Sequence, residues 1–218
     1  RTIADTEKVT YGKIMVVPDG RNLFSVFDME KSNTVIEELR KYEESYTLQS
    51  QVNYWLTYIT GQKLEVTTEK PLDDLVVIKY TSDGLNNISP SNLGTGVTHL
   101  AKVLIACLRA KQGNVILVEN PEIHLHPSAQ AKLGEFFAYV ANAGIQIIIE
   151  THCEHLINRV QYAVYNHEIK HDDIIILYKG NVTDPFKEIP LQNNGHFNVP
   201  FPEGFFDATL SELIEMNV

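Results

Sequence analysis

Short apolar runs alternate with stretches of helical spacing in the second half of the chain. The apolar runs Val115–Val118, Ile145–Ile149 and Ile174–Tyr178 are predicted strands, the first of them buried on both faces. Between them, Ser128–Asn142 and residues 151–169 have the 3.6-residue period of helices. Strand, helix, strand, helix and strand joined by short links predict a parallel sheet with right-handed crossovers. The pattern therefore predicts an α/β fold.

Local signals mark the ends of these two predicted helices. Pro127 suits a first helical turn, and Gly144 suits a helix stop. Thr151 and Glu154 have the spacing of a capping box, which predicts that the second helix begins at Thr151. The apolar face of the first helix consists of Leu133, Phe136, Phe137 and Val140.

The first half of the chain carries weaker patterns. Thr34–Ile59 is predicted to be helical with one break near Thr47–Ser50, and its charged residues are predicted to form a solvated face. Lys13–Val17 is a predicted strand. The runs Lys63–Thr68 and Leu75–Thr81 are predicted to pair as an antiparallel hairpin.

Polar side chains follow two of the predicted strands at the point where each strand ends. Glu119 and Asn120 follow the first strand, and Glu150 and His152 follow the second. Because the carboxyl ends of parallel strands meet at one edge of a sheet, where ligands bind, these residues are expected to lie close together. A carboxylate in that position can hold Mg²⁺. For one segment alone, a buried strand followed by a polar loop explains the pattern equally well; the convergence of two segments favours a site.

A glycine-containing segment precedes the first of these strands. Ser91–His99, SNLGTGVTH, leads into the apolar stretch Leu100–Lys111, which is a predicted helix. Gly94 and Gly96 free the backbone so that amides can converge at the helix start, an arrangement that attracts phosphate. The ordinary alternative for such a glycine pair is a flexible turn.

The order of these motifs resembles the ATP-binding-cassette (ABC) class of P-loop ATPases. It is most similar to bacterial AAA-type ATPases of the OLD (overcoming lysogenization defect), RecF and SMC neighbourhood. The segments that carry the resemblance are SNLGTGVTHL as the signature, ENPEIHLHP as the extended Walker B and D-loop, and IIETHCEHLINRV as the switch segment. The later segment IPLQNNGHFNVPFPEGFFDATLSEL is similar to the C-terminal segment of defence-associated bacterial ATPases. The resemblance implies a parallel sheet of the P-loop NTPase type with flanking helices and a small antiparallel portion.

The resemblance also implies a role for each matched residue. Glu119 takes the Walker B position and would organise Mg²⁺, and His152 takes the switch position and would contact the γ-phosphate of ATP. Pro127–Gln130 would form the D-loop at a subunit interface. The implied cofactors are ATP and Mg²⁺, and the implied assembly is a homodimer closed around ATP. The residues that would cap ATP bound to the second subunit are Gly94, Thr95, Gly96 and Thr98.

Two departures from the class bear on catalysis. Asn120 stands where a catalytic carboxylate usually follows the Mg²⁺ acid, and an amide cannot accept a proton from water. Either Glu122 acts as the base, or hydrolysis is slow, or Glu119 does both jobs. The 218 residues also contain no Gly-x4-Gly-Lys-Ser/Thr, since the pair Gly12-Lys13 lacks the preceding glycine and the following hydroxyl. The simplest interpretation is a C-terminal portion of a longer ATPase, with the P-loop in a missing N-terminal portion.

Two other functions stay open at this stage. A metal-dependent hydrolase would use imidazole and carboxylate ligands for Zn²⁺ or Mn²⁺. Its ligands would come from Glu119, Glu122, His124, His126, His152 and His155. A non-hydrolysing dimerisation module is the second alternative, and Asn120 is the residue that keeps it open.

Charge, hydrophobicity and cysteine content limit the possible binding partners and the cellular location. The formal net charge of −10 argues against a broad DNA-binding face on this portion, although DNA could bind elsewhere. No apolar run approaches the roughly 20 residues that span a bilayer, and two cysteines give no disulfide framework, which favours the cytoplasm. The expected organisation is a partial antiparallel and helical portion at 1–87, the ATPase core at 88–180 and a C-terminal appendage at 181–218. DNA repair, anti-phage defence and control of a partner nuclease are all compatible with these features.

Overall fold

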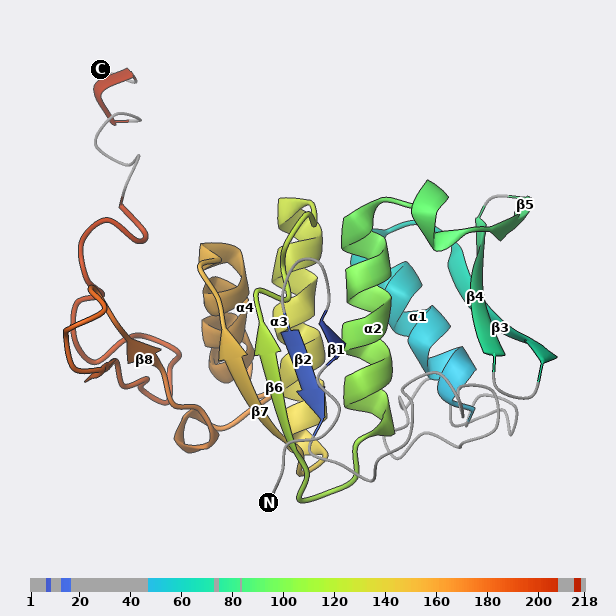
Figure 1. Ribbon diagram of the computed structural model, residues 1–218. Coiled ribbons are helices and arrows are strands. Elements are labelled where there is room, and N and C mark those ends of the chain that lie inside the picture. Colours follow the sequence, from blue (N-terminus) through green and yellow to red (C-terminus); the bar gives the residue numbers. More distant parts are fainter. Residues whose placement is uncertain are drawn as a thin grey trace.

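Among the residues that the structure describes, a mixed sheet of four strands contains the predicted strands Val115–Val118 and Ile145–Ile149. The computed structural model describes residues 7–8, 13–16, 47–72, 75–82, 84–207 and 214–216. The sheet order is β1-β2-β6-β7 (Figure 1), with strands at Glu7–Lys8, Lys13–Val16, Val115–Glu119 and Gln146–Glu150. β6 and β7 are parallel, and the other two pairs, β1 with β2 and β2 with β6, are antiparallel. The predicted parallel pairing of the first two apolar runs is therefore confirmed.

The two parallel strands are buried on one face more than on the other. In β6, Ile116 and Val118 are fully buried, whereas the alternate positions Val115 and Leu117 are half-buried. In β7, Ile148 points to the more open face and is 49% exposed. The expectation that Val115–Val118 is buried on both faces is wrong, because the described helices pack against the Ile116–Val118 face of the sheet.

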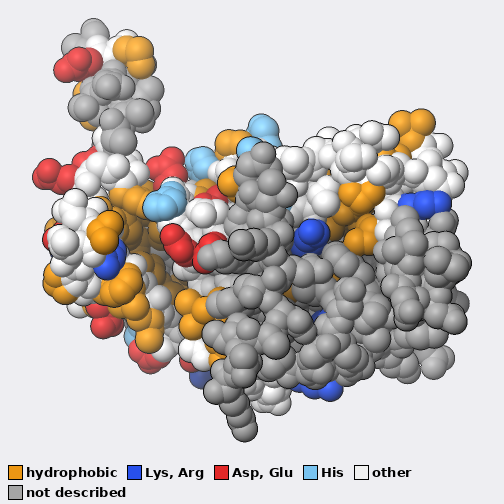
Figure 2. Space-filling model, viewed as in Figure 1, with side chains coloured by type: hydrophobic (Ala, Val, Ile, Leu, Met, Phe, Trp, Pro, Cys, Tyr) orange, Lys and Arg blue, Asp and Glu red, His pale blue; other side chains and the backbone are white. Residues whose placement is uncertain are grey.

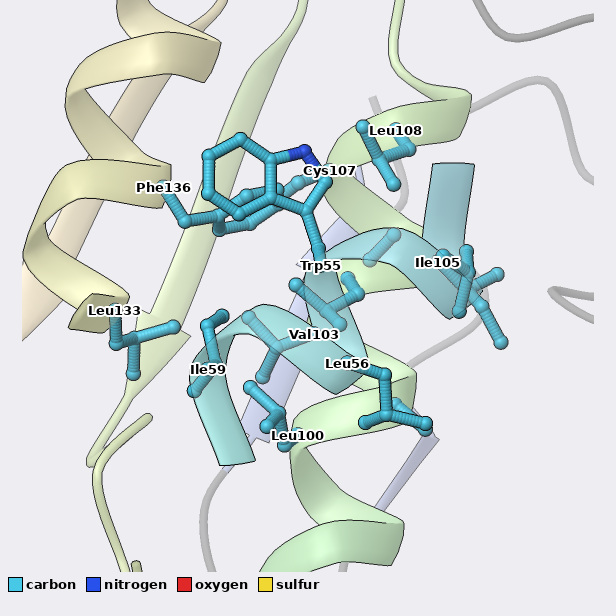
Figure 3. Packing of buried hydrophobic residues seen from close by; sticks show 14 of the residues in the cluster. Trp55, Leu56, Ile59, Leu100, Val103, Ile105, Cys107, Leu108, Leu133 and Phe136 are labelled. Atoms are coloured by element: carbon cyan, nitrogen blue, oxygen red, sulfur yellow. The ribbon is translucent and has the colours of Figure 1, made fainter. Parts of the chain in front are cut away.

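Helices α1 (Leu48–Thr60), α2 (Thr95–Arg109) and α3 (Pro127–Asn142) form the main core with β6. Trp55 of α1 packs edge-on against Phe136 of α3, with ring centroids 5.0 Å apart. Figure 3 shows side chains from α1, α2 and α3 meeting in this cluster. Burying each large apolar side chain contributes about 1.5–3 kcal/mol, so this cluster is what holds β6 in place. The predicted apolar face of α3 is confirmed as buried; it consists of Leu133, Phe136, Phe137 and Val140.

Helix α4 (Glu154–Tyr165) packs on α3 and extends the layer of helices behind β7 (Figure 1). It ends four residues before Ile169, the predicted end, and His167 just beyond it has a left-handed backbone with φ 61°. Helix α2 begins at Thr95, earlier than predicted. Residues 34–46, the first part of another predicted helix, lie outside the described residues, and α1 starts at Leu48, within the predicted break at Thr47–Ser50. No helix in the described part of the chain is both long and apolar enough to cross a membrane.

A second sheet contains β3 (Leu64–Leu72), β4 (Leu75–Ser82) and β5 (Leu85–Ile88), all antiparallel. The predicted hairpin of the first two strands is confirmed. β5 was not predicted, because its sequence LNNI has no alternation of apolar and polar residues. Tyr80 of β4 is 1% exposed, and burial raises its pKa to about 12, with a hydrogen bond to Thr98 of α2 offsetting part of the rise. This contact attaches the small sheet to the start of α2.

The third predicted strand of the parallel sheet, Ile174–Tyr178, is wrong. Only Leu177–Tyr178 is a strand, β8, and it pairs antiparallel with β9 (Lys187–Glu188) in a separate two-stranded sheet. Ile175 is 71% exposed, whereas Ile174 and Ile176 pack against a small second cluster beside α4. The run is apolar enough for a central strand, but only alternate residues, Ile174 and Ile176, pack against other apolar side chains.

Candidate functional site

The carboxyl ends of β6 and β7 lie side by side. Glu119 and Glu150 are partners in the strand register, and the Asn120 N–H donates to the Glu150 carbonyl at 2.8 Å, which carries the pairing one residue further. His152 follows two residues later and is exposed. The structure thus brings together the two strand ends that the sequence placed at one edge.

A tight turn follows Glu119. Asn120 and His124 have left-handed backbones, with φ 46° and φ 59°. Two hydrogen bonds close the turn, from the Ile123 N–H to the Asn120 carbonyl at 3.2 Å and from the Leu125 N–H to the Glu122 carbonyl at 3.1 Å. Asparagine enters this conformation more easily than most residues. Asn120 therefore has a conformational reason for its position, independent of any catalytic role.

The turn directs Glu122 inward. This side chain is 8% exposed, and its Oε1 accepts a hydrogen bond from the His152 backbone N–H at 3.3 Å. Its Oε2 is buried and has no hydrogen-bond partner among the described residues. Glu122 therefore fastens the β6–α3 loop to the segment after β7 and keeps one carboxylate oxygen unoccupied.

A cavity of about 420 Å³ opens beside this contact. It is lined by Glu122, Gln130, His152, Cys153, Glu154, His155, Phe205 and Phe206. Glu119 and Asn120 are not among the lining residues. Figure 2 shows histidine and acidic side chains close together on this face, near the C-terminal segment.

Phe205 and Phe206 are site residues that sequence reasoning missed. They belong to an aromatic cluster, with Phe205 and Phe206 centroids 4.9 Å apart and Phe201 4.7 Å from Phe206. The signal was present in the dense aromatic segment from Phe197 to Phe206. Nothing in that pattern says which part of the fold the aromatic residues cover.

The start of α4 differs from its prediction. Helix α4 begins at Glu154 with Cys153 as its N-cap, so Thr151 does not form a capping box with Glu154. Instead the Thr151 hydroxyl accepts a hydrogen bond from the Cys153 N–H at 3.1 Å. The residues between β7 and α4 are thereby held in an extended turn that leaves His152 on the surface.

The segment with Gly94 and Gly96 does not form a flexible loop. Gly94 is the N-cap of α2, but Gly96 lies in the first turn of the helix. A Cβ atom on Gly96 would lie 2.5 Å from the His124 carbonyl oxygen, so the helix start packs directly on the β6–α3 loop. Thr95 is exposed, and the Thr98 hydroxyl lies 3.5 Å from the Gly94 carbonyl. Gly96 therefore has a packing role in addition to any role toward phosphate.

His99 is another residue that sequence reasoning passed over. It is 3% exposed on α2 and lies against the Asn120 backbone. Burial lowers the pKa of its imidazole, and the contact with Asn120 offsets part of that effect. His99 thus joins α2 to the strand end that carries Glu119.

The hydrolase interpretation requires at least three of its six candidate ligands to converge. Within the described residues, no group of three or more His, Cys, Asp or Glu side chains could hold a metal ion. His126 is instead the N-cap of α3, where its Nδ1 accepts from the Ser128 N–H at 3.3 Å. A Mg²⁺ site needs fewer protein ligands, because one or two carboxylates suffice when substrate phosphates supply the other oxygen ligands. Glu119 at the strand end fits that requirement.

Comparison with known proteins gives one family. The family described as "AAA domain, putative AbiEii toxin, Type IV TA system" matches residues 9–158. No curated protein matches the chain. One similar solved structure is described as "Structural biochemistry of ATP-driven dimerization and DNA stimulated activation of SMC ATPases". It has 11% sequence identity and a TM-score of 0.49, and the match covers 78% of this chain and 91% of that chain.

The close approach of Gly96 to His124 predicts unequal effects of two neighbouring substitutions. Gly96→Ala should lower the free energy of unfolding by about 1–3 kcal/mol, because the new Cβ forces the loop away from α2. Gly94→Ala should lower it by about 0.5 kcal/mol, since nothing lies within 4 Å of a Cβ there and only the N-cap preference for glycine over alanine is lost. Urea denaturation measures both. Equal midpoints for the two variants would contradict the packing role of Gly96.

The buried His99 predicts a pH dependence of stability. Because its folded-state pKa is lowered, the unfolded chain binds a proton that the folded chain excludes, so stability should fall as the pH drops below about 6.5. The loss should level off once the pH passes below the folded-state pKa. His99→Gln removes this contribution, and denaturation curves between pH 7.5 and 5 should show a smaller slope for the variant. An unchanged slope would mean that the pKa of His99 is the same in the folded and the unfolded chain.

Proposed function

Because the chain belongs to the AAA domain family that matches it over residues 9–158, we propose that it supplies the signature, Walker B and switch segments of an ABC-type ATPase. The observation that carries this proposal is the juxtaposition of Glu119 and the segment of His152 at the ends of parallel strands. We place this ATPase core in residues 88–180, with a C-terminal appendage after it.

In the proposed reaction, Glu119 binds the magnesium ion that accompanies ATP. Mg²⁺ supplies charge neutralisation on the phosphate oxygens when it is bound. His152 is exposed at the neighbouring strand end and can donate to the γ-phosphate from there. The anchored backbone of His152 supports this role, because a donor held in place before the reaction costs no reorganisation.

The proton acceptor in this proposal is Glu122, with Asn120 orienting the attacking water. An amide can hold water but cannot take its proton. The unpartnered Oε2 of Glu122 supports the assignment, because Oε1 is already engaged by the His152 N–H. Hydrolysis through this arrangement should be slow, since Glu122 has both a structural and a chemical task. ATP-driven dimerisation without turnover is the alternative, and Asn120 favours it.

The sequence contains no Gly-x4-Gly-Lys-Ser/Thr, the motif that forms the phosphate cradle of P-loop ATPases. P-loop ATPases hold the phosphates with backbone amides and a lysine of the P-loop. We propose that a P-loop outside this sequence completes the site. The signature residues Gly94, Thr95, Gly96 and Thr98 would then cap ATP on a second subunit, which makes ATP a promoter of homodimers.

Anti-phage defence is the biological setting that the family description supports, since it names a toxin of a Type IV TA system. A partner nuclease fits such a role. DNA could bind elsewhere on the protein; the formal charge of −10 disfavours this portion as its surface.

Substitution of Glu119 tests the proposal. In the protein with its P-loop, Glu119→Gln should abolish ATP turnover, because an amide is a poor Mg²⁺ ligand. Glu150→Gln is a matched control, since Glu150 is the register partner of Glu119 at the end of β7. It should keep wild-type turnover. Phosphate release and circular dichroism measure activity and fold, and a fully active Glu119→Gln protein would exclude the Walker B assignment.

The 218-residue chain alone should bind Mg-ATP weakly and should not hydrolyse it. Each remaining contact, from Glu119 or His152, contributes on the order of 1–3 kcal/mol. A Kd of 1 µM corresponds to about 8 kcal/mol, which these contacts do not reach. Isothermal titration of the chain with Mg-ATP measures the affinity. Micromolar binding would reveal a phosphate site within this sequence and overturn the proposal of an external P-loop.

A further inference from the structure

Gln130 lies in the first turn of α3 and uses both ends of its side-chain amide. The Nε2 group donates to the Leu125 carbonyl at 3.0 Å and lies 3.4 Å from the Glu122 carbonyl. The Oε1 atom accepts from the Cys153 Sγ at 3.2 Å. Rotating the amide by 180° would place its oxygen against two carbonyls, so the network defines its orientation. Gln130 therefore joins the β6–α3 loop to the N-cap of α4.

Cys153 is suited to the donor side of this contact. It is 7% exposed, and burial raises the pKa of its thiol, so the S–H proton is retained at neutral pH. A retained proton is what the Gln130 oxygen requires. The same burial makes Cys153 a poor nucleophile, since the thiolate is the reactive form.

These contacts hold His152 and the residue that follows it, Cys153. Glu122 holds the His152 N–H through Oε1, and Gln130 holds the next residue, Cys153, through its thiol. Gln130 in turn contacts the Glu122 carbonyl. His152 is thus held at its own backbone N–H by Glu122, and through the side chain of the next residue by Gln130.

We propose that Gln130 is a positioning residue for His152. The inference rests on the proposed function, in which His152 donates to the γ-phosphate of ATP. By holding the Cys153 thiol and contacting the loop that carries Glu122, Gln130 keeps the His152 backbone in place for that contact.

Amide hydrogen exchange of His152, measured by NMR on the 218-residue chain, tests the positioning. Gln130→Met keeps the side-chain length and removes all three contacts, so exchange should become about fivefold faster, as expected for loss of one net hydrogen bond. Cys153→Ala should have a similar effect, and the double variant should add little more. Cys153→Ser keeps an O–H donor and should retain the wild-type rate.

Gln161→Met is the matched control, because Gln161 donates to the Gly195 carbonyl at 3.0 Å from another part of α4. It should leave His152 exchange unchanged. Unchanged exchange in Gln130→Met would overturn the proposal. Equally accelerated exchange along the whole of α3 would also overturn it, because that result describes a helix anchor and not a contact specific to His152.

Turnover in the protein with its P-loop supplies the second readout. Gln130→Met should lower kcat about tenfold with an unchanged KM for ATP, because the P-loop dominates binding, and Cys153→Ser should keep the wild-type kcat. An unchanged kcat in an active protein would overturn the role of Gln130. An inactive wild-type protein would instead overturn the proposed function, and the exchange measurements would then decide the positioning role by themselves.

Discussion

The parallel pairing of β6 with β7 is the interaction on which the rest of the site depends. It sets Glu119 beside Glu150, and the Asn120 N–H extends the ladder by one hydrogen bond to the Glu150 carbonyl at 2.8 Å. The residues that follow the two strands, 120–126 and 151–153, form loops whose positions depend on the strand ends. The apolar core formed by α1, α2 and α3 packs against one face of β6. This packing stabilises the position of the strand end and therefore of the site.

Two unusual backbone conformations turn this strand end into a site. Asn120 and His124 are left-handed, and the bend that they produce brings Glu122 under the His152 backbone. A left-handed backbone conformation costs a residue other than glycine about 1–2 kcal/mol. The compensation lies in the contacts that the bend permits, above all the hydrogen bonds of Glu122 and Gln130. An amide at position 120 therefore serves the fold, whatever it does to catalysis.

Regular elements were predictable where an apolar period matched the way the residues pack. The apolar patterns predicted the strands β6 and β7 and the helix α3. The order of the motifs on them gave the resemblance to the ABC-type ATPases. The run Ile174–Tyr178 failed because composition alone cannot distinguish a central strand from an extended segment that buries only Ile174 and Ile176. The contact of Gln130 with Cys153 joins residues 23 positions apart. A polar contact across that separation leaves no local pattern, and the same holds for Phe205 and Phe206, which line the same cavity as His155.

The absence of a side chain at Gly96 also constrains how this sequence can vary. The His124 backbone, which has a left-handed φ of 59°, occupies the space that a Cβ would need. An alanine at 96 becomes acceptable only if the loop at 124 first adopts another path. The two positions are therefore expected to evolve together, so that a relative with a larger residue at 96 should also have an altered loop length or turn residue near 124.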